Sequence, residues 1–171
     1  FCGSMDWHPN EDAMLFFMES VLPLIRETRP GVTVTIVGRN PGDKLKAVAE
    51  KSAVRVTGTV PDVRPFVQGA AVYIVPLRIG GGTRLKIYEA LAMGKAIVST
   101  TIGAEGLPLE EGKQIVRADT PADFASQVIG LLDDPARREA LGDAGRALMQ
   151  ARFSWSRVAE EFEPHCRELV S

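Results

Sequence analysis

Short apolar runs that alternate with helical patterns constrain the fold of this chain more than any other feature of its sequence. Four runs rich in β-branched residues predict buried strands over residues 32–37, 54–57, 71–76 and 96–100, and a weaker run covers 114–116. Helical patterns lie between them: Asn10 can cap a helix over 10–28, and shorter helices are expected at 42–50 and 63–68. This alternation predicts an α/β fold: a Rossmann-like, doubly wound parallel sheet with helices on both faces.

After residue 120 the pattern changes to helices alone. Thr120 with Asp123 has the spacing of a capping box, Asp134 before Pro135 indicates a second helix start, and Ser154 a third. No linker or internal repeat interrupts the 171 residues, and 45% of them are hydrophobic. We expect a single domain over 1–171, with extra C-terminal helices.

Several function classes lose support from composition. The longest uncharged apolar run, residues 70–77, falls far short of the roughly 20 residues that cross a bilayer. Cys2 and Cys166 lie at opposite ends without a CxxC spacing, so no metal site is expected. A net charge of −2 argues against nucleic acid as a partner. Nothing resembles a secretion signal, so we expect a cytoplasmic protein.

The distribution of charge points to an anion site in the middle of the chain. Residues 63–104 carry one acid, Glu89, against five cations: Arg64, Arg78, Arg84, Lys86 and Lys95. The segments on both sides have more acids than bases.

The glycine triplet Gly80, Gly81 and Gly82 lies in this basic segment, between a strand end and a helix. Such a run makes sense where the backbone adopts positive φ or approaches a ligand closely. With Thr83 as a cap, the loop would deliver a helix N-terminus, to which Arg84 and Lys86 add two positive charges. A diphosphate suits that site, whereas the alternative is a flexible turn with solvated cations. Neither a Walker motif nor GxGxxG is present.

Glu89 has two interpretations on the same helix. It lies three residues after Lys86, so the two side chains could form an ion pair on the surface. Alternatively, Glu89 accepts hydrogen bonds from ribose hydroxyls beside the phosphates.

Residues 3–10, 37–39, 56–62, 80–93 and 103–107 together resemble a known family. They are similar to the C-terminal, nucleotide-sugar-binding domain of retaining glycosyltransferases of the group-1 type, which share the two-domain GT-B fold. The resemblance implies that the chain is one half of such an enzyme and that the N-terminal, acceptor-binding domain is absent from it.

The resemblance also implies roles for individual residues. Glu89 occupies the place of the second glutamate of the family's E-x7-E motif, which binds ribose, while Gly81 replaces the first glutamate. The backbone at Val60 would lie against the base. Ser4 lies in the loop where the family commonly has cations for the diphosphate, and we keep it as a donor contact. The diphosphate is therefore assigned to Arg84 and Lys86, on local chemistry.

The implied reaction moves a sugar from a nucleoside diphosphate sugar, a UDP- or GDP-sugar, to an acceptor hydroxyl with retention, in polysaccharide or glycoconjugate biosynthesis. Arg84 and Lys86 would stabilise the leaving diphosphate. No DxD motif is present, so we expect no metal and no cofactor. The acceptor, which the sequence does not identify, would bind the missing half, so the isolated chain is expected to bind donor without turnover.

Two other functions stay open. The chain could be a non-catalytic nucleotide-sugar-binding module, or part of a GT-B sugar-nucleotide 2-epimerase. Both would bind the same donor.

The C-terminal helices have two interpretations as well. Their arginines could follow the inner face of a membrane, as in peripheral glycosyltransferases, but interspersed acids favour solvated helices. These arginines are Arg137, Arg138, Arg146, Arg152 and Arg157. Trp155, Val158 and Phe162 share one helical face, which would pack on the core or on the other domain.

Overall fold

Parallel strands form two small sheets in the computed structural model, which describes residues 1–153, 159, 162 and 163. Strand β1 (Thr35–Ile36) pairs with β2 (Arg55–Val56). Strand β4 (Ile97–Ser99) lies between β3 (Tyr73–Val75) and β5 (Val116–Arg117). The predicted parallel arrangement is confirmed. The strands are shorter than predicted, and the sheet is divided between β1 and β3.

Each helix predicted before residue 153 is present. The first helical pattern forms α1 (His8–Phe16), the π-helical segment η1 (Phe17–Val21) and α2 (Leu22–Thr28) in one continuous run. The remaining helices are α3 (Asp43–Lys51), α4 (Arg64–Gly69), α5 (Leu85–Ala92), the 3-10 turn η2 (Ile102–Ala104), α6 (Pro121–Asp133) and α7 (Pro135–Arg152).

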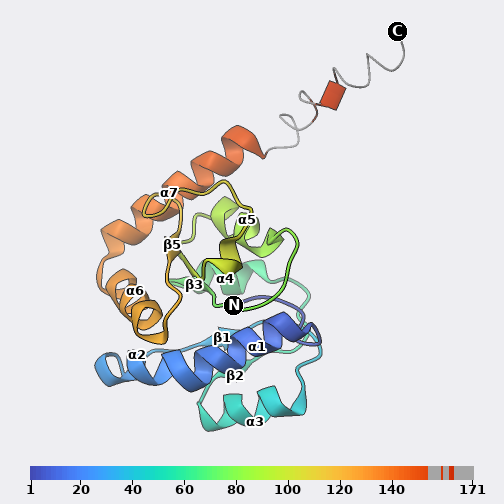
Figure 1. Cartoon of the computed structure of the whole chain (residues 1–171), viewed down its shortest axis with the longest axis vertical. Coiled ribbons are helices and arrows are strands. Elements are labelled where there is room, and N and C mark those ends of the chain that lie inside the picture. Colours follow the sequence, from blue (N-terminus) through green and yellow to red (C-terminus); the bar gives the residue numbers. More distant parts are fainter. Residues whose placement is uncertain (154–158, 160–161, 164–171) are drawn as a thin grey trace.

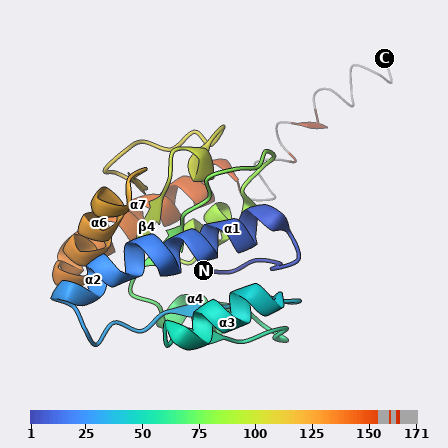
Figure 2. The same cartoon turned by 60° about the horizontal axis from the view of Figure 1, so that its bottom comes forward.

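The helices cover both faces of the strands. Helix α2 packs against α6, and α5 packs against α7. Figure 1 shows the run from α1 to α2 crossing one side of the molecule, with α7 on the opposite side. Figure 2 shows α3 on the far side of that first helical run from α6 and α7. The arrangement confirms the predicted α/β fold.

The π-helical turn has a local cause. Pro23 lies in the first turn of α2 and has no N–H to donate to a carbonyl in the preceding turn. Such a missing bond lets the helix widen by one residue over Phe17–Val21. The bulge keeps Phe17 and Met18 buried, and Phe17 packs edge-on against Phe124 of α6 at 6.1 Å between ring centroids.

Strands β3 and β4 are buried on both faces, as their continuous apolar sequences require. Ile36, Val98 and Val116 belong to a core with η1, α2 and α6. Val75 and Ile97 belong to a second core with α5. Helix α5, which carries Lys86 and directly follows Arg84, is therefore held in place by this second core.

Two predicted helix caps are confirmed and two are wrong. The Thr120 side chain accepts from the Asp123 amide at 3.1 Å, and Asp134 accepts from the Arg137 amide at 2.9 Å. Asn10 was expected to cap the first helix, but that helix begins at His8, so Asn10 lies inside it. Thr83 makes no capping bond, because α5 begins at Leu85. Ser154 lies outside the described residues.

Two arginines of α7, Arg137 and Arg138, hydrogen-bond to α6, and Arg146 donates to the Met93 carbonyl at 3.5 Å. Arg138 donates to the carbonyls of Leu131 and Leu132 in α6, at 2.5 and 2.9 Å. Arg137 donates to Gln127. Arg157, Trp155 and Val158 lie outside the described residues. Within the part of the chain that the structure describes, no helix is long and apolar enough to cross a membrane.

Candidate functional site

The first segment of the chain is pressed against the start of α5. The Gly3 amide donates to the Val37 carbonyl at 2.9 Å. A Cβ atom on Gly3 would lie 2.9 Å from the Lys86 Nζ atom, and one on Gly38 would lie 1.7 Å from the Gly3 carbonyl oxygen. Only glycine fits at position 38, whereas a side chain at position 3 would have to displace the ends of the Asn10 and Lys86 side chains. The tight packing places the loop after Gly3 beside the basic motif.

The glycine triplet forms an exposed loop with an unusual backbone. Gly80 has φ +106° and Gly82 has φ +87°, values that side chains rarely permit. A Cβ atom on Gly80 would also lie 3.1 Å from the Pro9 ring. The sequence argument for a positive-φ loop is confirmed at these two glycines.

The buried Arg84 side chain stabilises this loop through hydrogen bonds to the loop carbonyls. Its Nη1 atom donates to the Gly81 and Gly82 carbonyls at 2.5 and 2.8 Å, and Nη2 donates to the Gly80 carbonyl at 2.7 Å. The side chain is buried, and its Nε has no hydrogen-bond partner among the described residues. Most of the N–H groups of the guanidinium thus order the loop.

Helix α5 starts one residue later than the sequence suggested. Arg84 is its N-cap, the Leu85 amide donates to the Thr83 carbonyl at 3.1 Å, and no side chain caps the first turn. The N-terminal amides of an uncapped helix attract anions. The exposed glycine loop leads directly into these amides.

Lys86 lies in the first turn of α5 in an enclosed position. Its ammonium group donates to the Asn10 Oδ1 atom at 2.7 Å and lies 3.9 Å above the Phe1 ring. Burial lowers the pKa of Lys86 from its ordinary value to about 7; Cys2 and Glu89 oppose the change, and the nearby Arg84 charge adds to it. A neighbouring anion would restore the charged form.

A cavity of about 490 Å³ opens beside Lys86 and brings three predicted site residues together. Val60 lines it from the loop after β2, and Lys86 and Glu89 line it from α5. Glu89 is exposed, and the Lys86 ammonium donates to Asn10. Among the described residues, the ion pairs do not include one between Lys86 and Glu89.

The other predicted site residues do not line this cavity. Gly80, Gly81, Gly82, Thr83 and Arg84 belong to the loop before α5. Ser4 lies in the first loop, where its hydroxyl donates to Asp6 at 2.5 Å and accepts from the Arg39 Nε atom at 2.7 Å.

Charges around the cavity are more balanced than the sequence count suggested. Asp62 and Arg64 also line it, and the Arg64 Nε atom donates to Asp62 at 2.9 Å. Hydrogen bonds from Arg64 lower the pKa of the Asp62 carboxyl. With this pair matched, Lys86 is the cation of the cavity that has no carboxylate partner in the described part of the chain.

Two residues of the site escaped sequence reasoning. Asn10 is buried in α1; besides accepting from Lys86 it donates to the Ser4 carbonyl at 2.8 Å, so it links the first loop to α5. The buried Tyr73 hydroxyl accepts from the Cys2 amide at 3.2 Å at the back of the cavity. A polar Asn on an otherwise apolar helical face was the available signal for the first. No feature of the sequence marked Tyr73 as a residue of the site.

The described residues contain no group of three or more His, Cys, Asp or Glu side chains that could hold a metal ion.

Comparison with known families decides the relationship. Residues 1–134 match the family model described as "Glycosyl transferases group 1". The chain belongs to the group 1 glycosyl transferases. The match covers the strands, the glycine loop and α5.

Curated relatives of this group 1 glycosyl transferase domain are longer proteins. This chain is 31% identical over 150 residues to a phosphatidyl-myo-inositol mannosyltransferase of Mycobacterium tuberculosis; the match covers 82% of this chain and 39% of the relative. It is 26% identical over 137 residues to an uncharacterized 44.6 kDa protein in the cps region of Klebsiella pneumoniae, covering 75% of this chain and 35% of the relative. The chain thus spans less than half the length of these relatives.

Solved structures confirm the GT-B type of fold. TarM of S. aureus, solved with UDP, superimposes with a TM-score of 0.79 at 17% identity, over 95% of this chain and 34% of TarM. The C-terminal domain of the group 1 glycosyl transferase LpcC from Francisella tularensis gives a TM-score of 0.69 at 15% identity, over 91% of this chain and 84% of that domain.

Proposed function

We propose that this chain is the donor-binding, C-terminal half of a glycosyltransferase that uses a nucleoside diphosphate sugar. The observation that carries the proposal is the cavity of about 490 Å³ in which Val60, Lys86 and Glu89 meet beside an exposed helix N-terminus. Family membership and the near-complete overlap with the LpcC C-terminal domain support it.

The nucleoside lies in the cavity beside Lys86. The volume of this cavity, about 490 Å³, lies in the range of about 300 to 1,000 Å³ that is usual for small-molecule sites. The base lies along the backbone at Val60, and the exposed Glu89 carboxylate accepts hydrogen bonds from the ribose hydroxyls. No cation competes for Glu89 in the described ion pairs, which leaves its oxygens available.

The diphosphate lies between Lys86 and the start of α5. Lys86 supplies the positive charge, and the amides of the exposed loop 80–83 and of the first helical turn supply hydrogen bonds. Arg84 orders that loop through its carbonyls, which orients the amides in advance. Arg84 adds charge to the same end of the helix.

The reaction proceeds with retention through a transition state of oxocarbenium character, and negative charge develops on the leaving diphosphate. Preorganised amides and Lys86 stabilise that charge, so the reaction needs no metal ion or further cofactor. The acceptor binds the N-terminal half across the cleft between domains. The isolated chain therefore binds donor and does not turn it over.

A panel of nucleotides tests the proposal. UDP, GDP, TDP and their hexose derivatives are added to the isolated chain, with GDP-mannose included because relatives are named mannosyltransferases. At one hundred times the dissociation constant, a ligand specific for the folded state adds about 2.7 kcal/mol of stability, which raises Tm by roughly 5 to 10 °C. Free nucleosides and inorganic pyrophosphate are the controls. If no nucleoside diphosphate raises Tm above the controls at millimolar concentration, the proposal is wrong.

A further inference from the structure

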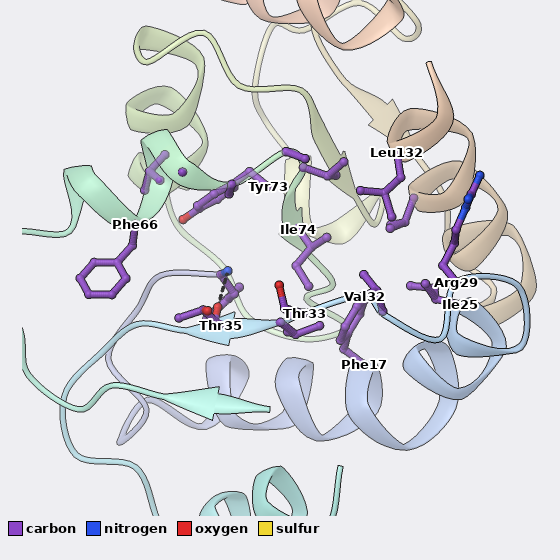
Figure 3. Close-up of a pocket in the computed structure, with 18 of the residues that line it drawn as sticks. Phe17, Ile25, Arg29, Val32, Thr33, Thr35, Phe66, Tyr73, Ile74 and Leu132 are labelled. Atoms are coloured by element: carbon purple, nitrogen blue, oxygen red, sulfur yellow. Dashed lines mark hydrogen bonds between the residues drawn. The ribbon is translucent and has the colours of Figure 1, made fainter. Parts of the chain in front are cut away.

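Two cavities lie close to the first segment of the chain, and Lys86 faces one of them. The larger, of about 850 Å³, lies between β1 and β3, with Thr33 and Thr35 on one side and Tyr73 on the other (Figure 3). The smaller is the cavity of about 490 Å³ beside Lys86. Tyr73 lines both cavities, whereas Lys86 lines the smaller one and not the larger. The Lys86 ammonium is therefore presented to the smaller cavity, and its contacts decide what it can bind there.

The hydrogen-bond partner of this ammonium is a buried polar side chain of α1. Asn10 is 7% exposed; its Oδ1 atom accepts from the Lys86 Nζ atom at 2.7 Å, and its Nδ2 atom donates to the Ser4 carbonyl at 2.8 Å. An ammonium can only donate and a carbonyl can only accept, so a single orientation of the Asn10 amide satisfies both partners. Asn10 therefore holds the Lys86 ammonium in one place relative to the first loop.

The loop that carries Ser4 is fixed as well. The adjacent Met5 amide donates to the Arg39 carbonyl, in the loop after β1, at 2.9 Å. On the other side of Ser4, a Cβ atom on Gly3 would lie 2.8 Å from the Asn10 Nδ2 atom, so the loop packs closely against this amide. The Asn10 side chain thus has little freedom to turn toward another partner.

Helix α1 carries two acids directly after this asparagine, and both are directed elsewhere. Asp12 accepts from the Arg78 Nη2 and Nε atoms at 2.5 and 3.0 Å. A Cβ atom on Gly42 would lie 2.7 Å from the Glu11 Oε1 atom, which places that carboxylate against the start of α3. Among the described residues, Lys86 forms no ion pair with any acid. The α1 residue that contacts Lys86 is thus a neutral amide.

The neutrality of this partner matters because other titratable groups surround Lys86. The groups that face Lys86 or line its cavity are the Phe1 amine, Cys2, Asp62, Arg64, Tyr73, Arg84 and Glu89. Of these, Asp62 and Arg64 pair with each other. Burial brings the pKa of Lys86 to about 7, so a charged neighbour would change its protonation. A carboxylate in place of the Asn10 amide would retain the proton and would also compensate its charge.

We propose that Asn10 is a positioning residue: it holds the Lys86 ammonium at the smaller cavity through a neutral hydrogen bond, which leaves the positive charge for the diphosphate of the donor. This inference rests on the proposed function, in which Lys86 binds that diphosphate. In the free chain Asn10 uses one of the three N–H donors of the ammonium, so two remain for phosphate oxygens. An acid at position 10 would compete with the phosphate, and an apolar residue would leave the ammonium without this acceptor.

Two substitutions at position 10 test this role in opposite directions. Asn10→Asp places a carboxylate beside Lys86, and Asn10→Leu removes the acceptor. At neutral pH both lose the hydrogen bond to the Ser4 carbonyl, so the difference between them measures the contact with Lys86 alone. Asp12→Asn is the matched control, because it makes the reverse exchange of side chains two residues later and leaves the partner of Lys86 in place.

Nitrogen NMR of the Lys86 Nζ atom follows its titration without any ligand. The midpoint should lie near pH 7 in the unaltered chain and should rise by roughly one unit or more in Asn10→Asp. It should fall in Asn10→Leu and should stay within about 0.3 unit in Asp12→Asn. If Asn10 were purely structural, both position-10 variants would have a lower Tm and an unchanged midpoint, and that result overturns the proposal.

Calorimetry with UDP-glucose, GDP-mannose and TDP-glucose at pH 6, where Lys86 is charged, measures the effect on binding. Asn10→Asp should weaken binding by roughly tenfold or more, because its carboxylate competes with the diphosphate, and Asn10→Leu by about threefold or more. Equal affinities of Asn10→Asp and the unaltered chain overturn the proposal. If the unaltered chain binds none of the three nucleotide sugars, the proposed function fails, and the Lys86 midpoints still decide whether Asn10 controls this lysine.

A measurement on the unaltered chain keeps the test decisive if both position-10 variants fail to fold. The NMR signal of the Asn10 side-chain amide should titrate with the same midpoint as Lys86, since the two side chains are hydrogen-bonded at 2.7 Å. The same signal should show no such step in Lys86→Met. An Asn10 signal that is flat in the unaltered chain, or that keeps its step in Lys86→Met, overturns the proposal.

Discussion

Arg84 and Lys86 lie two residues apart in one motif, yet the structure uses their charges differently. The Arg84 guanidinium is buried and donates to the three glycine carbonyls of the loop before α5. The Lys86 ammonium lies at the edge of the cavity shared with Glu89, where it has a neutral partner, Asn10. One cation shapes the site, and the other is available to a ligand.

The difference teaches that a basic motif cannot be treated as a sum of charges. Both residues satisfied the same sequence criterion, which was positive charge at a helix start after glycines. The hydrogen-bond partners decide the role of each cation. A guanidinium that donates to backbone carbonyls stabilises the loop, whereas a buried ammonium without a carboxylate partner is stabilised when an anion binds beside it. Five experiments separate these roles, from the largest expected effect to the smallest.

Arg84→Ala should affect folding most. It removes charged hydrogen bonds to three carbonyls, at roughly 1.5 to 3 kcal/mol for a bond to a charged group, so we expect a loss of about 3 kcal/mol in the free energy of unfolding. Urea denaturation measures it, with the exposed Arg137→Ala as control, which should change stability by less than about 0.5 kcal/mol. An Arg84→Ala variant with unchanged stability and weaker donor binding would instead make Arg84 a direct ligand of the diphosphate.

Lys86→Met should affect binding and spare folding. Loss of its charged hydrogen bond to the diphosphate should weaken binding of a nucleoside diphosphate by about 1.5 to 3 kcal/mol, roughly 10- to 150-fold. Isothermal titration calorimetry measures the change. Lys113→Met is the matched control, because this exposed lysine pairs with Glu110 and lines neither cavity. Equal affinities of the two variants would contradict the role of Lys86.

Glu89→Ala should cost about 1.5 kcal/mol of binding free energy through the lost ribose hydrogen bonds. The same nucleotide without its 2′- and 3′-hydroxyls should bind the unaltered chain equally weakly and should lose nothing further in the variant. Calorimetry on the four combinations gives the coupling energy. Additive losses would show that Glu89 does not touch the ribose.

The pH dependence of binding should follow Lys86. Its pKa is about 7 in the free chain and rises beside a bound anion, so binding takes up a proton above pH 7. Affinity for a nucleoside diphosphate sugar, whose diphosphate does not titrate here, should fall by up to about tenfold per pH unit above 7 and stay level below it. Without ligand the sign is opposite: the unfolded chain holds the proton up to about pH 10, so stability should rise with pH above 7. Titrations from pH 6 to 9 check this. Lys86→Met should remove the slope above pH 8, because the Phe1 amine, whose pKa burial lowers to about 6, adds its own slope below that pH.

The smallest effect separates a real helix cap from an apparent one. Thr120→Ala removes a capping bond of 3.1 Å and should cost about 1 kcal/mol of stability. Thr83→Ala removes no capping bond and should cost less than about 0.5 kcal/mol. Chemical denaturation of both variants decides it, and equal losses would contradict the assigned start of α5.

The order of strands and helices could be predicted because burial on both faces leaves a continuous apolar sequence, as at Tyr73–Val75 and Ile97–Ser99. The role of Gly80 and Gly82 could be predicted because few other residues adopt positive φ. Such signals are local in sequence.

Other features depend on contacts between distant segments. Asn10 looked like a helix cap, but Pro9 lets the helix start earlier, and the Asn10 side chain then reaches Lys86, 76 residues later. The division of the sheet between β1 and β3 also has no local signal, since Val32–Val37 is apolar enough for a longer strand.

A crystal structure of the chain with a bound nucleoside diphosphate tests the central claim most directly. We predict the diphosphate within hydrogen-bond distance of the Lys86 ammonium and the amides at the start of α5, with the ribose against Glu89. A nucleotide bound elsewhere, with Lys86 still turned to Asn10 and the smaller cavity unoccupied, would contradict it.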